Sequence, residues 1–177
     1  MKRAEFEHVI RAAVAIVHDE LIVVGSQAIL ARYPDAPSDL LVSDELDMYP
    51  RTHPERAIDL DALIGAGSQF EETFGYRAHG VAPETSTLPE GWEQRLVRVE
   101  VESIDGGMAV AWALEPHDLV LAKLAAGRQQ DYDFAVGALR ANLVERLELV
   151  RRCEGLGIAI RNDVRRRVEG VTVRAGS

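Results

Sequence analysis

The chain has 177 residues, of which 47% are hydrophobic and 28% charged, and its formal net charge is −9 at pH 7; this fits one globular domain, or a domain with a helical appendage, that buries a real core. The acidic balance argues against general affinity for nucleic acid, so we expect no DNA partner, and the single Cys153 excludes an intrachain disulfide and a cysteine metal cluster. No apolar run approaches the roughly 20 residues that span a bilayer and no signal-peptide pattern opens the chain, so we expect a cytoplasmic protein without a membrane partner.

The first third of the chain predicts a helix, a strand and a second helix. Residues 3–19 have helical periodicity with an apolar stripe made by Phe6, Ile10, Val14 and Val17. The β-branched run 21–24 predicts a short strand that Gly25-Ser26 ends, before a predicted helix over 27–32 and a proline-containing loop over 33–38.

The Gly25-Ser26 turn can be interpreted in two ways. A turn between a strand and a helix leaves backbone N–H groups free, glycine lets a ligand approach closely, and the Ser26 hydroxyl adds a donor, so the turn suits a phosphate. Alternatively, Ser26 is simply the N-cap of the following helix. The acidic strand downstream favours the phosphate interpretation.

Residues 45–49 predict a strand that stops at Pro50 and carries two alternating carboxylates. Glu45, Asp47 and Tyr49 share one face, and Leu46 and Met48 take the other. The Cα atoms of Glu45 and Asp47 would lie roughly 6.5–7 Å apart, so their side chains can converge on a hard cation such as Mg²⁺. The alternative is a solvated edge strand without a ligand.

The remaining elements predict the fold class. Helices are expected over 58–64 and 68–74, the latter with a capping box of Ser68 and Glu71, and a strand over 76–79. The alternating segment 95–102 and the segment 108–114 predict a hairpin with its turn at 105–107. From Pro116 the chain is predicted to be helical to near its end, with breaks at Gly127, Asn142 and 155–157. We therefore predict an α/β (α+β) fold in which a small mixed sheet flanked by helices (residues 1–114) is followed by a helical part (residues 115–177) packed on it.

Lys123 is unusual within this chain. The sequence has two lysines against eighteen arginines, yet this lysine stands inside the apolar run 119–126 of a predicted helix. A buried ammonium group must meet an anion or extend to solvent, and we favour contact with a phosphate or a carboxylate. Asp131 is expected to cap the next helix, and a further role in orienting Lys123 or Arg128 stays open.

Two motifs together resemble a known family. Gly25-Ser26 followed by an acid-x-acid strand resembles the signature of minimal nucleotidyltransferases of the DNA polymerase β superfamily. Residues 115–131 (EPHDLVLAKLAAGRQQD) resemble the helical Lys…Arg…Asp motif of toxin-type (AbiEii-like) nucleotidyltransferases of bacterial toxin–antitoxin and abortive-infection systems. There are two departures: Glu45 stands where Asp is usual, and the spacing from Gly25 to Glu45 is longer than in the smallest members.

The resemblance implies a nucleotidyltransferase fold and a reaction that moves a nucleoside monophosphate from a nucleoside triphosphate to an RNA or protein hydroxyl. It implies Mg²⁺ or Mn²⁺ as cofactor, and an antitoxin protein as a candidate partner. Glu45 and Asp47 would be catalytic and hold the metal. The implied nucleotide-binding residues are Gly25, Ser26, Lys123, Arg128 and Asp131.

A third catalytic carboxylate is usual in the superfamily. Glu100 is the first candidate here and Glu102 the second, although both can equally be exposed acids that pair across the hairpin. The five histidines lack metal-ligand spacing, so no zinc site is predicted. The departure at Glu45 also leaves open a catalytically inactive module that binds a nucleotide or a protein partner.

The C-terminal part has its own charge balance, with nine arginines against five acidic residues from Arg140 onward. Such a part could bind an acidic partner or RNA. The interpretation that we favour is a solvated helix surface on which the arginines pair with neighbouring acids.

Overall fold

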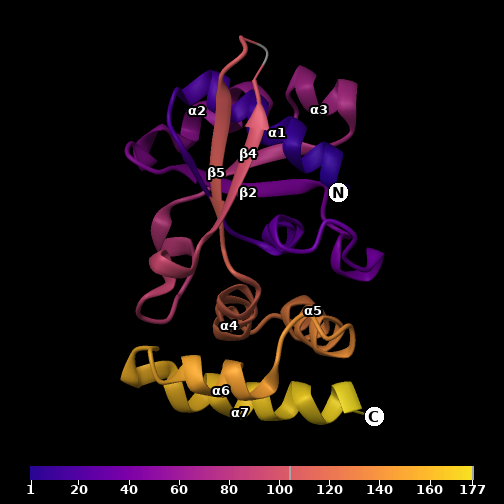
Figure 1. Cartoon of the computed structure of the whole chain (residues 1–177), viewed down its shortest axis with the longest axis vertical. Helices are drawn as coiled ribbons and strands as arrows, with labels where there is room; N and C mark the ends of the chain where they lie inside the picture. Colours follow the sequence, from indigo (N-terminus) through magenta and orange to yellow (C-terminus); the bar gives the residue numbers. More distant parts are fainter. Residues whose placement is uncertain (104, 177) are drawn as a thin grey trace.

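The computed structural model describes residues 1–103 and 105–176. Ile104, beside the predicted hairpin turn, and Ser177, the end of the predicted helical part, lie outside the described residues. Figure 1 places the sheet and helices α1 to α3 in the upper half and helices α4 to α7 in the lower half. The strands are β1 (Leu21–Val23), β2 (Glu45–Pro50), β3 (Arg77–Gly80), β4 (Val97–Glu102) and β5 (Met108–Ala113). The α-helices are α1 (Arg3–Val17), α2 (Ala57–Ile64), α3 (Gln69–Phe74), α4 (Pro116–Ala126), α5 (Gln129–Arg140), α6 (Arg146–Cys153) and α7 (Ile158–Gly176).

Five strands form one mixed sheet in the order β3-β2-β1-β5-β4. β1 pairs antiparallel with β2 and parallel with β5, while β2 pairs parallel with β3 and β4 pairs antiparallel with β5. This sheet with its flanking helices and the helical C-terminal part confirms the predicted fold class. β2 includes Pro50, which pairs with Leu21 at the strand end, where the missing N–H of proline is tolerated.

Helix α1 covers the sheet with the stripe that its periodicity predicts. Phe6, Ile10 and Val17 are at most 2% exposed and Val14 is half-buried, while α1 packs against strands β2 to β5. The helix ends two residues earlier than predicted, because His18 adopts the left-handed conformation (φ 52°) and Asp19 accepts hydrogen bonds from the backbone of Thr52 and His53.

The segment after Gly25 is a 3₁₀ helix, η1 (Ser26–Ala31), rather than an α-helix. Four of its residues are buried (Gln27, Ala28, Ile29 and Leu30), so the tight segment fills the space between β2 and α4. Four further 3₁₀ turns join the elements: η2 (Ser38–Leu40), η3 (Pro54–Arg56), η4 (Pro83–Thr85) and η5 (Trp92–Arg95).

The capping box predicted at α3 is present in a modified form. The Ser68 hydroxyl accepts a hydrogen bond from the Glu71 backbone N–H at 3.2 Å, whereas the Glu71 carboxylate accepts from the N–H of Gly67 at 2.7 Å, one residue earlier than predicted. Glu71 thereby stands close enough to Arg77 for an ion pair of 2.6 Å.

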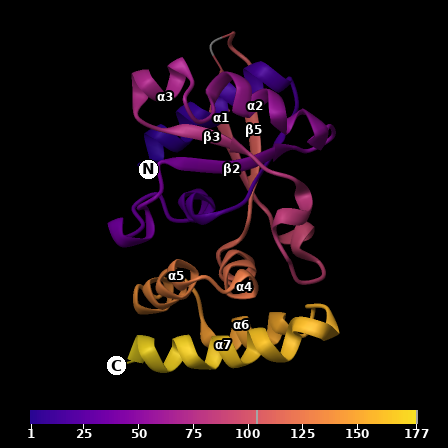
Figure 2. The ribbon, with the colours of Figure 1, turned by 180° about the vertical axis from the view of Figure 1, so that it is seen from behind.

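The helical part follows the predicted breaks. α4 ends at Gly127 (φ 72°), α5 ends before Asn142 (φ 55°), and Gly155–Gly157 separates α6 from α7. Seen from behind in Figure 2, α4 and α5 lie between the sheet and the α6–α7 pair. Helix α4 packs on η1 and α5 packs on η2, so these two helices face the end of the sheet where β1 meets η1.

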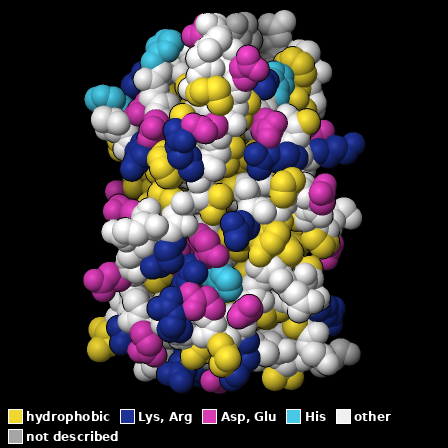
Figure 3. Space-filling model, in the orientation of Figure 1, with side chains coloured by type: hydrophobic (Ala, Val, Ile, Leu, Met, Phe, Trp, Pro, Cys, Tyr) yellow, Lys and Arg dark blue, Asp and Glu magenta, His cyan; other side chains and the backbone are white. Residues whose placement is uncertain are grey.

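The arginines of the C-terminal helices pair with acidic neighbours. Arg151 and Arg152 both contact Glu148 at 2.6 Å, and Arg174 contacts Asp133 at 3.0 Å. On the face in Figure 3, basic and acidic side chains are interspersed over this part of the molecule. The pairs of Arg151 and Arg174, whose side chains are half-exposed or more, agree with the predicted solvated helix surface. Arg152 does not, because its side chain is only 10% exposed and also pairs with Glu115 and Asp118 at the start of α4.

Candidate functional site

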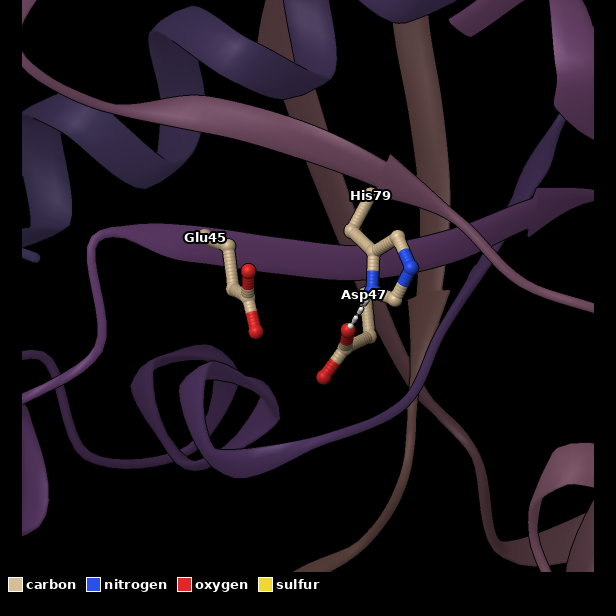
Figure 4. Close-up of side chains that lie close together, drawn as sticks. All are labelled: Glu45, Asp47 and His79. Atoms are coloured by element: carbon tan, nitrogen blue, oxygen red, sulfur yellow. Dashed lines mark hydrogen bonds and ion pairs between the residues drawn. The ribbon is translucent and has the colours of Figure 1, made fainter. Parts of the chain in front are cut away.

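The two acidic side chains of β2 extend from the same face of the strand, as their alternation predicts. Leu46 and Met48 are fully buried on the opposite face, whereas Glu45 and Asp47 are half-buried. Figure 4 shows both carboxylates on the side of β2 that faces η1. The strand therefore presents two carboxylates to one location.

Gly25 allows the carboxylate of Asp47 to come close to the end of β1. Its backbone (φ 69°, ψ −177°) lies in a region open almost only to glycine, and a Cβ added there would overlap Asp47 Oδ2 and lie 2.8 Å from Asp47 Cγ. The Val24 N–H donates to the Asp47 carbonyl at 2.9 Å and holds the two segments together. Gly25 is therefore required for two reasons: its backbone conformation is open almost only to glycine, and the Asp47 carboxylate leaves no space for a side chain.

His79 joins the acid pair from the neighbouring strand. It lies opposite Asp47 in the parallel β2–β3 register, and its Nδ1 is 2.8 Å from Asp47 Oδ1 (Figure 4). Among the described residues, Glu45, Asp47 and His79 form the only group of three whose potential metal-ligand atoms all lie within 4.8 Å of one another. Sequence patterns missed His79, because the sequence of a four-residue strand does not show which other strand it pairs with.

Electrostatics differ at the two acids. Burial raises the pKa of Asp47, although the hydrogen bond with His79 opposes this shift. Glu45 forms an ion pair with Arg77 at 2.7 Å, and Arg77 also contacts Glu71. A cation near Asp47 would relieve the cost of its buried charge, and at Glu45 it would share the carboxylate with Arg77.

Lys123 of α4 has the anionic contact that its buried position predicts. Only 8% exposed, it donates to Asp131 Oδ1 at 3.2 Å and lies 4.8 Å from the ring centroid of Phe134. Burial lowers the pKa of Lys123. Asp131 is fully buried and also accepts from the Arg128 backbone N–H and guanidinium, which closes the predicted cap of α5. Although burial alone would raise it, the bonds from Arg128 and Lys123 lower the pKa of Asp131.

One cavity of about 230 Å³ brings most of the predicted residues together. It lies between the ends of β1 and β2, the segment after β3, and α4. The predicted residues that line it are Gly25, Ser26, Glu45, Asp47, Lys123 and Arg128. A second cavity of about 460 Å³ adjoins the first, because both are lined by Ser26, Ser43, Lys123 and Gln130.

Three predicted residues do not line this cavity: Asp131, and the two candidates for a third carboxylate, Glu100 and Glu102, which both stand on β4. Asp131 lies outside the cavity lining and accepts a hydrogen bond from the Lys123 ammonium at 3.2 Å. Glu100 stands on the outermost strand β4, separated from β2 by β5 and β1, and forms an ion pair with Arg98 at 2.5 Å. Its alternation predicted the exposed face of β4 correctly, but the strand order keeps it away from Glu45 and Asp47, where His79 stands instead.

The fold and the candidate site together indicate the class of protein to which the chain belongs. A small mixed sheet sets a Gly-Ser turn against an acid-x-acid strand, with a lysine opposite, which is the arrangement expected from the nucleotidyltransferase resemblance. A family model described as "Nucleotidyltransferase of unknown function (DUF6036)" matches residues 5–151, and the chain belongs to this family. The match does not distinguish the toxin type that residues 115–131 resemble.

Neither the comparison with curated proteins nor the comparison with solved structures gave a match. Within residues 1–103 and 105–176, no helix combines the length and the apolar character needed to cross a bilayer.

Proposed function

We propose that this protein is a cytoplasmic, metal-dependent nucleotidyltransferase that moves a nucleoside monophosphate from a nucleoside triphosphate to a hydroxyl group of RNA or protein. One observation carries the proposal: Glu45 and Asp47 share a cavity with Ser26 and Lys123, so ligands for a cation and donors for phosphate face the same space. The family to which the chain belongs supports the same reaction class.

The donor set fits the implied cofactor. Mg²⁺ and Mn²⁺ both accept carboxylate oxygens, and Glu45 and Asp47 supply them from one strand face. A divalent ion at these residues would neutralise charge on the phosphate oxygens. Gly25 contributes by leaving the Asp47 carboxylate room beside the end of β1.

The chain's own residues would bind and orient the triphosphate. The Ser26 hydroxyl is available as a donor to a phosphate oxygen, and the Lys123 ammonium, held by Asp131, adds positive charge at the opposite wall. The adjoining cavity, which Lys123 and Ser26 also line, offers space for the nucleoside or for the acceptor. The acceptor oxygen would form a bond to the α-phosphorus, and the bond between the α-phosphorus and the oxygen that bridges to the β-phosphate would break. Pyrophosphate would leave, and the proton of the acceptor hydroxyl would pass to water.

Transfer of label tests this reaction. Purified protein is incubated with each α-³²P-labelled nucleoside triphosphate and Mg²⁺ or Mn²⁺, in separate reactions with total RNA and with total protein. We expect label in one acceptor pool with wild type and background label with Asp47→Asn. Equal labelling by the two proteins would contradict the assignment.

A second candidate function is an inactive module that binds a nucleotide or a protein partner. The ion pair of Glu45 with Arg77 favours it, because this contact satisfies the unusual first acid without any metal. Metal-dependent triphosphate binding without pyrophosphate release, in the presence of every acceptor pool, would favour this candidate over the transferase.

A role in a toxin–antitoxin pair, with an antitoxin protein as partner, is part of the proposal and is supported by the motif in residues 115–131. Expression of the chain alone should arrest bacterial growth in an Asp47-dependent manner, and a small neighbouring gene should relieve the arrest. Normal growth on expression of active enzyme would contradict this role.

A further inference from the structure

His79 contributes a nitrogen atom where the acid pair contributes oxygen atoms. Its side chain is 50% exposed and lines the same cavity as Glu45 and Asp47, so the imidazole is accessible from that cavity. Parallel pairing with β2 fixes its position, because His79 lies opposite Asp47 in the register. Two carboxylates and one imidazole therefore offer potential ligand atoms that all lie within 4.8 Å of one another.

The chemistry of this donor set differs from that of an all-carboxylate set. Mg²⁺ prefers oxygen ligands, so a nitrogen ligand adds little to the affinity of a site for this ion. Imidazole suits Zn²⁺, Cu²⁺, Fe²⁺ and Ni²⁺ best, and the affinities of mixed nitrogen and oxygen sites rise along the first-row series, which begins at Mn²⁺. Replacing a carboxylate oxygen with an imidazole nitrogen thus shifts the balance away from Mg²⁺.

We propose that His79 is a ligand of the catalytic cation and gives this site a preference for transition-metal ions, Mn²⁺ among them, over Mg²⁺. The inference rests on the proposed function for its cation site, and it concerns which ion the site selects. It is tested by cation binding in the absence of nucleotide and acceptor.

A different role for His79 has a different consequence. If the imidazole only orients Asp47 through the 2.8 Å hydrogen bond, its loss weakens every cation alike, since a misplaced carboxylate is a poorer ligand for all of them. If the imidazole binds the ion, its loss lowers affinity for Mn²⁺ more than for Mg²⁺. The ratio of the two dissociation constants therefore separates a ligand from a positioning residue.

The test compares wild type with His79→Asn and His79→Asp. Asparagine can still donate a hydrogen bond to Asp47, and aspartate supplies an oxygen ligand in place of nitrogen. His53→Asn is the matched control, because His53 also lies beside a carboxylate (Glu55, 3.2 Å) but does not line the cavity. Thermal melts of the cation-free proteins confirm that each variant folds.

Electron paramagnetic resonance of free Mn²⁺ gives the dissociation constant for Mn²⁺. Competition of Mg²⁺ with bound Mn²⁺ gives the dissociation constant for Mg²⁺. We expect the preference for Mn²⁺ over Mg²⁺ to fall about tenfold or more in both His79 variants and to stay unchanged in His53→Asn. Pulsed measurements should detect nitrogen coupled to bound Mn²⁺ in wild type only. An unchanged ratio in His79→Asn, or bound Mn²⁺ without nitrogen coupling in wild type, would overturn the inference and leave the proposed function standing. Absence of any cation binding in wild type would also overturn the inference, whereas the proposed function is decided separately by the labelling assay with nucleoside triphosphate.

Discussion

The carboxylate of Asp47 occupies the space beside Gly25 into which any other side chain at residue 25 would project. This relationship joins the end of β1 to the acid strand and leaves Asp47 facing the cavity. It also explains why a glycine follows the buried run 21–24: the backbone at this point has φ 69° and ψ −177°, which glycine adopts at little cost.

Gly25→Ala should therefore impair both stability and cation binding. Backbone strain at such a conformation costs on the order of 1–3 kcal/mol, and the added Cβ displaces Asp47. Gly75→Ala is the control, since Gly75 has φ 77° but open space around it. Urea unfolding should report a loss for both variants, and only Gly25→Ala should lose Mn²⁺ binding; intact binding in Gly25→Ala would refute the steric explanation.

Lys123 and Asp131 should be energetically coupled. Lys123→Met leaves a fully buried carboxylate with Arg128 as its remaining partner, so we expect a loss of about 1–3 kcal/mol, below the 3–5 kcal/mol typical of an uncompensated buried charge. The double variant with Asp131→Asn should cost less than the two single variants together, by about 0.5–3 kcal/mol. Strictly additive effects in urea unfolding would show that the pair contributes nothing jointly.

Glu45 can be tested through its length. If Glu45 holds the cation, Glu45→Asp should keep or increase transfer activity, because a shorter acid still offers an oxygen ligand and withdraws from Arg77. Glu45→Ala should lose activity. Full activity of Glu45→Ala in the labelling assay would place the cation elsewhere, and Asp44 would be the next residue to examine.

The pH dependence of stability should include a contribution from Glu148. The pKa of Glu148 is lowered from 4.5 to about 2, mainly because its carboxylate accepts hydrogen bonds from Arg151. Because the folded pKa is depressed, the unfolded chain takes up the proton first, so the stabilisation is complete above pH 4.5 and is lost as the pH falls towards about 2. Glu148→Gln should flatten this part of the unfolding free-energy curve. A curve of the same slope in the variant would assign the acid sensitivity to other carboxylates.

Local patterns predicted the parts of the site that depend on one segment. Alternation along residues 45–49 indicated that Glu45 and Asp47 share a face, and an apolar helix indicated that Lys123 needs an anion. His79 could not be found in this way, because its contact with Asp47 depends on parallel pairing of strands that α2 and α3 separate in the chain. The same limit explains Glu100: alternation gives the face of a strand but not its place in the sheet.

The central claim is that Glu45 and Asp47 form a cation-dependent triphosphate site. Asp47→Asn tests it, since the neutral amide keeps the shape of the side chain and removes both the charge and the cost of burying it. The apo variant should therefore be folded and at least as stable as wild type, because the burial that raises the pKa of Asp47 no longer has a charge to disfavour.

Calorimetric titration of wild type and Asp47→Asn with a nucleoside triphosphate, with and without Mg²⁺ or Mn²⁺, is the most direct measurement. We predict tight binding by wild type only when a divalent ion is present, and loss of that binding in Asp47→Asn. Equal and metal-independent affinity in the two proteins would contradict the assignment of the site.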